Sequence, residues 1–371
     1  MSFLTSLGLM SGTSMDGIDG AILVSDGLTL QSFGPTHYRP FTDAEQALLR
    51  FALQQARELT DRTARPGVLA DAEQMITDTH CEAIAVLLEK ARAAHMDIEV
   101  IGFHGQTVIH KPKDNMTVQI GLPQKIANRF KLPVVADFRA ADMLAGGQGA
   151  PLVPVMHLAL AKMAKLMLPC SIVNIGGVGN VTLISRDENL AAFDTGPGNA
   201  LINDLMEKRT GAVLDEGGQT AARGEVDEQV LQQLLKDPYF NLPSPKSLDR
   251  DHFKYALELV KDLSTENAAA TLTAFTAASL AIGLRSAQEK LQKVVVAGGG
   301  AHNPILIKEL KKRTNLDVVT ADALGWSADS LEAQAFAYLA VRSMRELPLT
   351  FSGTTGVAQP TTGGVIFQPR A

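Results

Sequence analysis

The chain has 371 residues, of which 46% are hydrophobic and 20% are charged, and its formal net charge is −6. The composition is that of an ordinary globular protein, and the length suggests two domains. Because the net charge is negative, we expect neither a nucleic acid nor an anionic membrane as a partner.

The first part of the chain predicts strands and helices in alternation. Strands are expected at Leu4–Met10, Gly20–Val24, Thr29–Gly34, Glu99–Phe103, Met116–Ile120 and Val134–Asp137. Helical periodicity covers Ala44–Arg57, Val68–Ala94 and Pro123–Phe130. The first two strands flank a glycine-rich turn, which is typical of a β-hairpin.

The second part repeats this pattern. Strands are expected at Cys170–Ile175, Val181–Ile184, Ala191–Asp194, Val294–Ala297 and Asp317–Thr320. Helices are expected at Pro151–Leu166, Pro197–Thr210, Glu225–Lys236, Ser264–Leu291, Pro304–Arg313 and Asp329–Glu346, where Asp329 to Glu332 resemble a capping box. Two halves that each contain a glycine-turned hairpin predict two α/β domains around a cleft, with ligands beyond the strand ends.

Three observations indicate the cytoplasm. The N-terminal MSFLTSLGLM lacks the basic region and the long apolar core of a signal peptide. Cys81 and Cys170 are too few for a disulfide framework and have no His or Cys neighbour at zinc spacing. The longest apolar stretches, such as Ala268–Ile282, are interrupted by Thr and Ser and fall short of a membrane span.

The glycine-rich turns do not match the common nucleotide or nucleophile motifs. The chain has no Gly-Lys dipeptide, which excludes a Walker A loop. Gly177-Val178-Gly179 lacks the third glycine of a Rossmann fingerprint and leads into a strand. In the first turn, Asp16 stands where a nucleophile elbow needs a glycine.

A phosphate cradle without lysine is the remaining functional interpretation of the first turn. Backbone N–H groups, together with the hydroxyls of Thr13 and Ser14, can bind phosphate oxygens where Gly12 permits a close approach. Asp16 and Asp19 would repel phosphate unless Mg²⁺ lies between them. The structural alternative is that Asp16-Gly17 is only a hairpin turn.

Six segments together resemble the anhydro-N-acetylmuramic acid kinases, a branch of the actin, sugar kinase and heat-shock chaperone superfamily. They are GLMSGTSMDGIDGAIL, IGFHGQT, DFRAADMLAGGQGAPL, VNIGGVGNVT, FDTGPGNALIND and VAGGGAHNP. The resemblance implies an α/β fold with two ribonuclease-H-like (actin-like ATPase) domains whose mixed sheets flank a nucleotide cleft. Domain I is expected at 1–131 plus 328–371 and domain II at 132–327.

The same resemblance implies ATP and Mg²⁺ as cofactors. The expected ATP contacts are Gly12, Thr13, Ser14, Met15, Asp16, Gly17, Ile18 and Asp19 in the first phosphate loop, Asn174, Gly176, Gly177 and Asn180 in the second, and Gly298, Gly299 and Gly300 beside the nucleoside. Many members of the superfamily carry an Asp where this chain has Met10. We therefore expect Asp16 and Asp19 to hold the metal, directly or through water.

The family reaction hydrolyses the 1,6-anhydro bridge of the sugar and phosphorylates O6, giving N-acetylmuramic acid 6-phosphate for cell-wall recycling. Asp194 is the expected general base, because it ends a predicted strand just before a helix whose dipole favours the ionised carboxylate. Asp137 and Asp142 are competing candidates for the base. A structural, N-cap-like Asp194 is the alternative.

Eight residues are expected to contact the sugar: His104, Gln106, Thr107, Arg139, Asp142, Gly147, Gln148 and Glu332. Arg139 suits a carboxylate such as the lactyl group. The structural alternatives are a satisfied histidine at a strand end for His104, a salt bridge for Arg139, turn geometry for the glycines and helix capping for Glu332.

Two other functions compete with this one. A sugar kinase of the same superfamily would phosphorylate a free hydroxyl and use Asp194 to deprotonate it. A chaperone-like, nucleotide-switched binding module would need an appended partner-binding domain, for which we expect no room because the chain ends about 25 residues after its last predicted helix. The resemblance also suggests a homodimer.

Overall fold

The computed structural model describes residues 2–12, 14–327 and 330–370. The chain forms two compact units: Met1–Met163 with Glu332–Ala371, here unit 1, and Ala164–Leu331, here unit 2. Unit 1 therefore extends past the expected domain end at residue 131. The reason is that the strand after this point pairs in parallel with a strand of unit 1, through Ile101 with Val134 and Gly102 with Val135.

The sheet of unit 1 has the strand order β12-β6-β4-β1-β2-β3, and β5 pairs with β4. Its strands are β1 (Leu4–Ser11), β2 (Gly17–Ser25), β3 (Leu30–Pro40), β4 (Val100–Lys111), β5 (Met116–Ile120), β6 (Val134–Ala136) and β12 (Val365–Phe367). The first three strands form an antiparallel meander, and β4 runs parallel to β1. Only β12 has no counterpart among the predicted strands.

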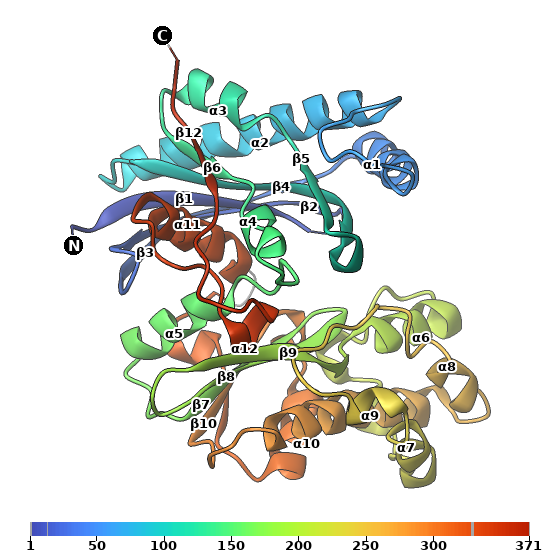
Figure 1. Cartoon of the computed structure of the whole chain (residues 1–371). Helices are drawn as coiled ribbons and strands as arrows, with labels where there is room; N and C mark the ends of the chain where they lie inside the picture. The colour runs from blue at the N-terminus through green and yellow to red at the C-terminus, as the bar shows by residue number, and fades with distance from the viewer. Residues whose placement is uncertain (1, 13, 328–329, 371) are drawn as a thin grey trace. The chain divides into compact units, whose positions relative to one another are not determined.

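The helices of unit 1 are α1 (Asp43–Ala56), α2 (Leu69–Ala93), α3 (Pro123–Phe130), α4 (Ala140–Leu144), α5 (Pro154–Met163), α11 (Leu331–Met344) and α12 (Ser352–Thr355). Of these, α2 and α3 lie on one face of the sheet and α11 lies on the other (Figure 1). Two glycines let α11 pack directly on the strands: a Cβ at Gly8 would lie 2.0 Å from the Ala333 carbonyl oxygen, and one at Gly102 would lie 2.1 Å from that of Phe336. This contact fixes α11 against β1 and β4.

The sheet of unit 2 has the strand order β11-β10-β7-β8-β9. Its strands are β7 (Cys170–Ile175), β8 (Val178–Ile184), β9 (Leu190–Pro197), β10 (Lys293–Ala297) and β11 (Val318–Thr320). Its helices are α6 (Ala200–Thr210), α7 (Glu228–Leu234), α8 (Ala256–Leu259), α9 (Thr265–Arg285) and α10 (Pro304–Thr314).

The two sheets share the same topology of five core strands. In each, three consecutive strands form an antiparallel meander, and two later strands continue the sheet in parallel with the first. The repeat predicted from the two glycine-turned hairpins is therefore present, and the predicted ribonuclease-H-like fold class is confirmed.

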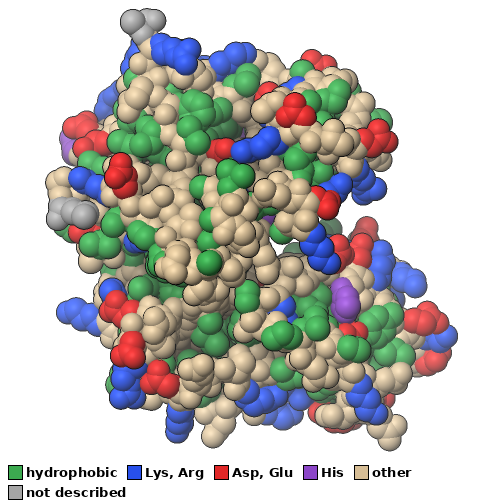
Figure 2. Space-filling model, viewed as in Figure 1, with side chains coloured by type: hydrophobic (Ala, Val, Ile, Leu, Met, Phe, Trp, Pro, Cys, Tyr) green, Lys and Arg blue, Asp and Glu red, His purple; other side chains and the backbone are tan. Residues whose placement is uncertain are grey.

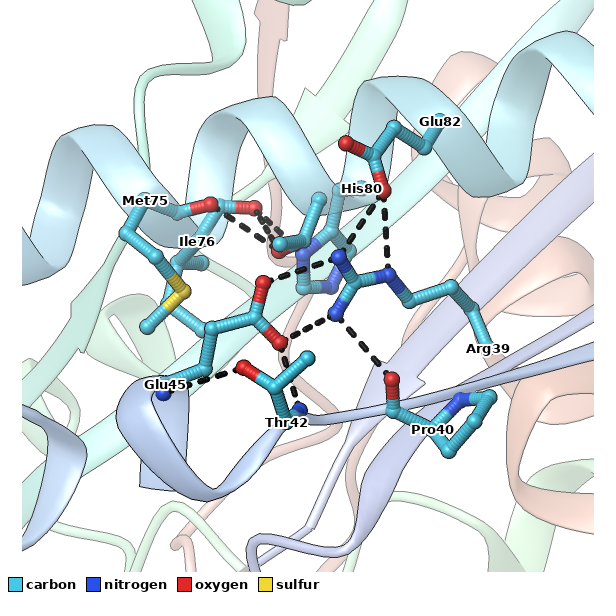
Figure 3. Close-up of polar contacts among 9 residues, drawn as sticks. Arg39, Pro40, Thr42, Glu45, Met75, Ile76, His80 and Glu82 are labelled. Atoms are coloured by element: carbon cyan, nitrogen blue, oxygen red, sulfur yellow. Dashed lines mark hydrogen bonds and ion pairs between the residues drawn. The ribbon is translucent and has the colours of Figure 1, made fainter. Parts of the chain in front are cut away.

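Arg39 ties the end of β3 to two helices of unit 1 (Figure 3). Its guanidinium donates to both carboxylate oxygens of Glu45 on α1 and to Glu82 on α2, the latter at 2.9 and 3.0 Å. Thr42 and Glu45 form a capping box at the start of α1. Since Pro40 pairs with Gly17 across β2 and β3, this clamp also supports the strand that follows the first glycine-rich turn.

Charged side chains of both signs are interspersed over the face in Figure 2. Helix α9 is long and apolar enough to cross a membrane by length and composition, but 89% of its apolar window is buried within the structure. Its sequence is therefore explained by its position as a core helix. Cys81 and Cys170 are both free and buried.

Candidate functional site

Glycine packing separates structural glycines from those that leave room for a ligand. Most glycines in the described ranges either have a positive φ or would place a Cβ within 3.4 Å of another atom. Four have neither constraint: the nearest atom to a Cβ would lie at 3.6 Å for Gly12, 3.9 Å for Gly176, 3.8 Å for Gly177 and 3.7 Å for Gly299. All four lie in the three predicted turns, where an absent side chain leaves space for a close approach.

The first turn joins β1 to β2, and hydrogen bonds with Gln106 on β4 support it. Gln106, which is buried, accepts a hydrogen bond from the Ser11 hydroxyl and donates one of 3.1 Å to the Gly12 carbonyl oxygen. The Ser14 hydroxyl donates to Asp16 at 2.6 Å. The side chain of Gln106, which was predicted to contact sugar, therefore supports this turn. Thr13 lies outside the described residues.

Three other residues of the first turn have packing roles. Ile18 is completely buried in the core of unit 1, and Met15 packs against that core with a left-handed φ of 56°. A Cβ at Gly17 would lie 2.6 Å from the Tyr38 ring and from the Arg39 carbonyl oxygen. These contacts explain Met15, Gly17 and Ile18 without a ligand.

Asp16 and Asp19 both lie near Tyr38, which pairs with Asp19 across β2 and β3. Burial raises the pKa of Tyr38, and the negative charges of Asp16 and Asp19 raise it further. Asp16 is exposed and Asp19 is half-buried. Among the described residues there is no group of three or more His, Cys, Asp or Glu arranged to hold a metal.

The second turn, between β7 and β8, carries the start of α6. The backbone N–H of Asn199 donates to the Gly176 carbonyl oxygen at 2.7 Å, and that of Gly198 donates to the Gly177 carbonyl oxygen at 2.9 Å. A Cβ at Gly198 would lie 2.2 Å from the Gly176 oxygen, so this glycine is needed for packing. The carbonyls of the turn thus point toward α6, and the turn is fixed in shape.

The third turn follows β10 and lines a pocket of about 350 Å³ in unit 2, within the usual range of small-molecule sites. Gly298 adopts a φ of 75°, where a Cβ would meet the Asn174 side chain, and Gly300 packs on Ile175. Gly299 is the glycine of this turn that lines the pocket. Asn174, Gly298 and Gly300 therefore shape the site, while Gly299 faces it.

Several pocket residues were not predicted individually. The lining also contains Asn199, Ile202, Asn203, Leu214, Asp215, Glu216, Gly217, His302 and Asn303. Asp215 is buried and accepts N–H bonds from Thr220 and Ala221, which fixes the loop that forms one wall. The quoted segments FDTGPGNALIND and VAGGGAHNP contain five of these residues, so the motifs were an available signal.

Asp194 lies within β9, which continues to Pro197 before α6 begins at Ala200. The strand was predicted to end at Asp194, with Pro197 opening the helix and its dipole favouring the charged form. That prediction was wrong: burial raises the pKa of Asp194 to about 6, and the N–H bond from Leu248 only partly opposes this shift. The carboxylate is therefore more basic than an ordinary aspartate.

Asp194 forms a row with two predicted residues across the sheet. Asn174 pairs with Asn180 between β7 and β8, and Asn180 pairs with Asp194 between β8 and β9. Residues paired in this way point to the same face of a sheet. The Asp194 backbone is held by the Lys246 carbonyl oxygen at 3.0 Å and by the Tyr239 hydroxyl at 2.7 Å.

His104 and Arg139 form the centre of the predicted sugar cluster in unit 1. The Arg139 guanidinium donates to Nε2 of His104 at 3.0 and 3.2 Å and to the Gly149 carbonyl oxygen at 2.8 Å. His104 Nδ1 lies 2.8 Å from the Gly105 carbonyl oxygen, so both ring nitrogens have partners. Burial, aided by Arg139, holds the pKa of His104 well below its usual value. His104 is thus a neutral imidazole that orients Arg139.

Asp142 organises the loop that contains Gly147, Gln148 and Gly149. Its carboxylate accepts from the Gly149 N–H at 2.7 Å and from the hydroxyls of Thr350 and Thr355. A Cβ at Gly147 would lie 2.2 Å from this carboxylate, and the Gln148 N–H donates to the Thr355 carbonyl oxygen at 2.8 Å. Asp142 is 2% exposed and fully engaged, which leaves it no free oxygen for a catalytic role.

The two remaining predicted sugar contacts differ in exposure. Thr107 is half-buried and accepts a 3.2 Å bond from the Gln119 side chain. Glu332, in the first turn of α11, is exposed. Burial lowers the pKa of Arg139 to about 10, and the negative charge of Glu332 opposes this shift. Glu332 and Arg139 therefore present opposite charges near each other in unit 1, while Asp329 of the predicted capping box lies outside the described residues.

Comparison with known proteins adds the identity of the family. The model of the family described as anhydro-N-acetylmuramic acid kinase matches residues 4–369. The anhydro-N-acetylmuramic acid kinase of Methylorubrum extorquens is 50% identical over 379 residues, with both chains covered completely. That of Rhodopseudomonas palustris CGA009 is 48% identical over 367 residues, covering 99% of this chain and 100% of the relative.

The site and these matches define a kinase that phosphorylates a sugar hydroxyl. The chain belongs to the anhydro-N-acetylmuramic acid kinase family. The resemblance identified from the six sequence segments is therefore confirmed.

Proposed function

We propose that this chain uses ATP to convert 1,6-anhydro-N-acetylmuramic acid into N-acetylmuramic acid 6-phosphate, with release of ADP. The observation that carries the proposal is the set of four open glycines, Gly12, Gly176, Gly177 and Gly299. Glycines that neither the backbone conformation nor packing requires are explained by a ligand that approaches the main chain closely. Phosphate oxygens held by turn N–H groups provide such a ligand.

In this proposal unit 2 binds the nucleoside in the 350 Å³ pocket beside Gly299. The exposed carboxylate of Glu216 suits ribose hydroxyls, and Asn203 supplies an amide that can pair with a base or a hydroxyl. In unit 2, Gly176 and Gly177 leave room for phosphate oxygens beside the second turn. In unit 1, Gly12 leaves similar room beside the first turn, which also carries Ser14.

Mg²⁺ fits the carboxylates of the first turn. Mg²⁺ is commonly bound by one or two carboxylates together with water and substrate phosphates. Asp16 and Asp19, both near Tyr38, provide two carboxylates, and ATP and water would complete the coordination of a metal held there. The ion would neutralise charge that develops on the transferred phosphoryl group.

Asp194 is the proposed general base. It takes a proton from water as that oxygen bonds to the anomeric carbon and the bond from this carbon to O6 breaks. O6 then bonds to the γ-phosphorus as the bond to ADP breaks, so the phosphoryl group takes the place of the acid that protonates the leaving oxygen in ordinary glycosidases. A half-buried carboxylate with a pKa of about 6 is ionised and basic at neutral pH. Asp142 is engaged on both oxygens and Asp137 is paired with Arg62, which favours Asp194.

The competing function is phosphorylation of a free hydroxyl on another sugar. Release of ADP should be compared for 1,6-anhydro-N-acetylmuramic acid, N-acetylmuramic acid and N-acetylglucosamine. We expect activity on the anhydro sugar, and water labelled with ¹⁸O should place the label at C1 of the product. Activity on the free sugars alone, or an unlabelled C1, would contradict the proposal.

The proposed reaction serves cell-wall recycling in the cytoplasm. The proposed partners are ATP, the sugar and a second copy of the chain in a homodimer, with no nucleic acid or membrane partner. Light scattering at several concentrations, with and without ATP, tests the dimer.

A further inference from the structure

A second pocket lies in unit 1, outside the residues that were predicted to bind ATP. It has a volume of about 420 Å³ and is lined by Arg62, Thr63, Gln119, Leu122, Asp137 and Phe367, among others. We call it the Arg62 pocket. Its lining includes Asp137, directly after β6, and Leu122, directly before α3, and the carboxyl ends of strands are the common place for ligands in sheets of this kind.

The Arg62 pocket is joined to the predicted sugar cluster through His104. His104 lines the pocket, and its Nε2 accepts the hydrogen bonds from Arg139. Only His104 would therefore separate a ligand in this pocket from the guanidinium of Arg139, which is a predicted sugar contact.

One ion pair supplies the accessible polar groups. Arg62 Nη2 lies 2.6 Å from Asp137 Oδ1, with 42% and 28% of the two side chains exposed. Within the described part of the chain, the other guanidinium nitrogens of Arg62 and the second oxygen of Asp137 have no hydrogen-bond partner. Asp137 also has a left-handed φ of 56°, a conformation that often occurs at functional sites.

The second ion pair of the pocket has a structural role. Arg65 Nε donates to Glu73 at 2.8 Å, and its Nη1 donates to the backbone oxygens of Arg62 and Ala64. Glu73 also accepts the Gly121 N–H at 3.2 Å. The pocket thus contains two guanidinium groups and two carboxylates, and this balance disfavours a phosphate or another dianion.

The chemistry matches a neutral, polyhydroxylated ring. Sugar hydroxyls both donate and accept, so they can use the free oxygen of Asp137 and the free N–H groups of Arg62 together. Phe103, Leu122 and Phe367 provide an apolar wall for the C–H face of a pyranose or for an acetamido methyl group.

We propose that the Arg62 pocket holds part of the sugar substrate, with Asp137 accepting from a sugar hydroxyl and Arg62 donating to a sugar oxygen. The proposal rests on the proposed function and assigns two further residues to sugar specificity. A separate, regulatory sugar would use the same chemistry, so the experiments distinguish the two sources.

The first experiment compares Arg62→Gln and Asp137→Asn with wild type. Asn tolerates a left-handed φ, so the second variant keeps the turn. Loss of a hydrogen bond to a charged group should raise KM for 1,6-anhydro-N-acetylmuramic acid by about 10- to 100-fold. KM for ATP should stay within twofold. Arg186→Gln, which removes an exposed ion pair with Glu289 in unit 2, is the matched control and should change neither constant.

The second experiment measures binding of the same sugar by calorimetry without ATP. Leu122→Trp, which fills the pocket, should remove this binding while an ATP analogue still binds. One sugar per chain, lost in the variant, identifies the substrate, whereas two sugars per chain with unchanged KM identify a regulatory site and overturn the proposal.

Failure of the pocket and failure of the proposed function give different results. If wild type releases no ADP with the anhydro sugar but Leu122→Trp abolishes sugar binding, the pocket stands and the proposed reaction fails. If wild type turns over the anhydro sugar and all three pocket variants keep its KM within twofold, the pocket proposal is wrong.

Discussion

The backbone N–H of Leu248 donates a 2.8 Å hydrogen bond to Oδ2 of Asp194. This bond favours the charged carboxylate, but burial disfavours it more strongly, and the resulting pKa is about 6. The environment of Asp194 thus gives a carboxylate that is ionised at neutral pH and still able to take a proton from water.

Asp194→Asn should abolish turnover. A general base contributes about 10²–10⁴ in rate, so ADP release with the anhydro sugar should fall at least a hundredfold. ATP affinity, measured by calorimetry, should remain within twofold. Asp187→Asn, an exposed change on the β8–β9 turn, serves as the control. More than a tenth of the wild-type rate in Asp194→Asn would remove Asp194 from this role.

The pH dependence of the reaction should report the same group. A base works in its deprotonated form, so kcat/KM for the sugar should fall about tenfold per pH unit below about 6, the pKa of Asp194. Any residual activity of Asp194→Asn should lack this inflection. A wild-type profile that stays flat from pH 5 to 8 would contradict the assignment.

Asp194→Asn should also stabilise the protein at neutral pH. The pKa of the folded state is about 6, against 3.8 for the ordinary group, so the folded state binds a proton that the unfolded state releases between these values. Stability attributable to Asp194 is therefore lost as pH rises from about 4 to 6. The variant should gain about 1–3 kcal/mol in urea unfolding at pH 7.5 and nothing at pH 3.5. An equal gain at both pH values would exclude this origin.

The fold was largely predictable because its signals are local. Hairpin turns, Pro123 at the start of α3 and apolar strand runs such as Val294–Ala297 depend on neighbouring residues, and these elements lie close to their predicted positions. β12 was missed because Val365–Phe367 is short and acquires its structure by pairing with β6, far away in the sequence. The extension of unit 1 beyond residue 131 has the same cause, since β6 pairs with β4 of unit 1, about thirty residues earlier in the chain.

The positions of the three turns of the candidate site could be predicted from sequence motifs, but the roles of individual residues could not. The glycine pattern located the three turns, yet only a structure separates Gly177, which is open, from Gly198, which is packed. The partners of Asp142 are Gly149 and two threonines more than 200 residues later, a relationship that no local pattern contains. The pKa of Asp194 depends on burial and on a distant N–H, so its direction was predicted wrongly.

Two alanine substitutions separate ligand glycines from packing glycines. Gly177→Ala adds a Cβ with no atom closer than 3.8 Å, so thermal stability should be unchanged while KM for ATP rises about tenfold because the new methyl group occupies the phosphate approach. Gly198→Ala places a Cβ 2.2 Å from the Gly176 oxygen and should destabilise the fold by about 1–3 kcal/mol. Thermal unfolding and ATP titration are the measurements, and an unchanged KM for ATP in Gly177→Ala would count against the cradle.

Arg39→Met should destabilise unit 1 in a pH-dependent way. Arg39 and Glu45 are 18% and 17% exposed, so removing the guanidinium leaves a half-buried carboxylate without its partner and should cost about 2 kcal/mol at pH 7. The hydrogen bond from Arg39 is the largest cause that lowers the pKa of Glu45 below its usual 4.5. A carboxyl with a lowered pKa contributes its full stability above the pKa of the unfolded state and loses it as pH falls through the pKa of the folded state. The difference in stability between wild type and variant should therefore shrink below about pH 4.

Urea unfolding of wild type and Arg39→Met at pH 7 and pH 3 measures this difference. Arg50→Met on α1, the helix that carries Glu45, removes only a 2.9 Å bond to Gln46 and should change stability by less than about 0.5 kcal/mol. A difference between Arg39→Met and wild type that is as large at pH 3 as at pH 7 would mean that Arg39 stabilises unit 1 through the packing of its aliphatic chain and not through Glu45.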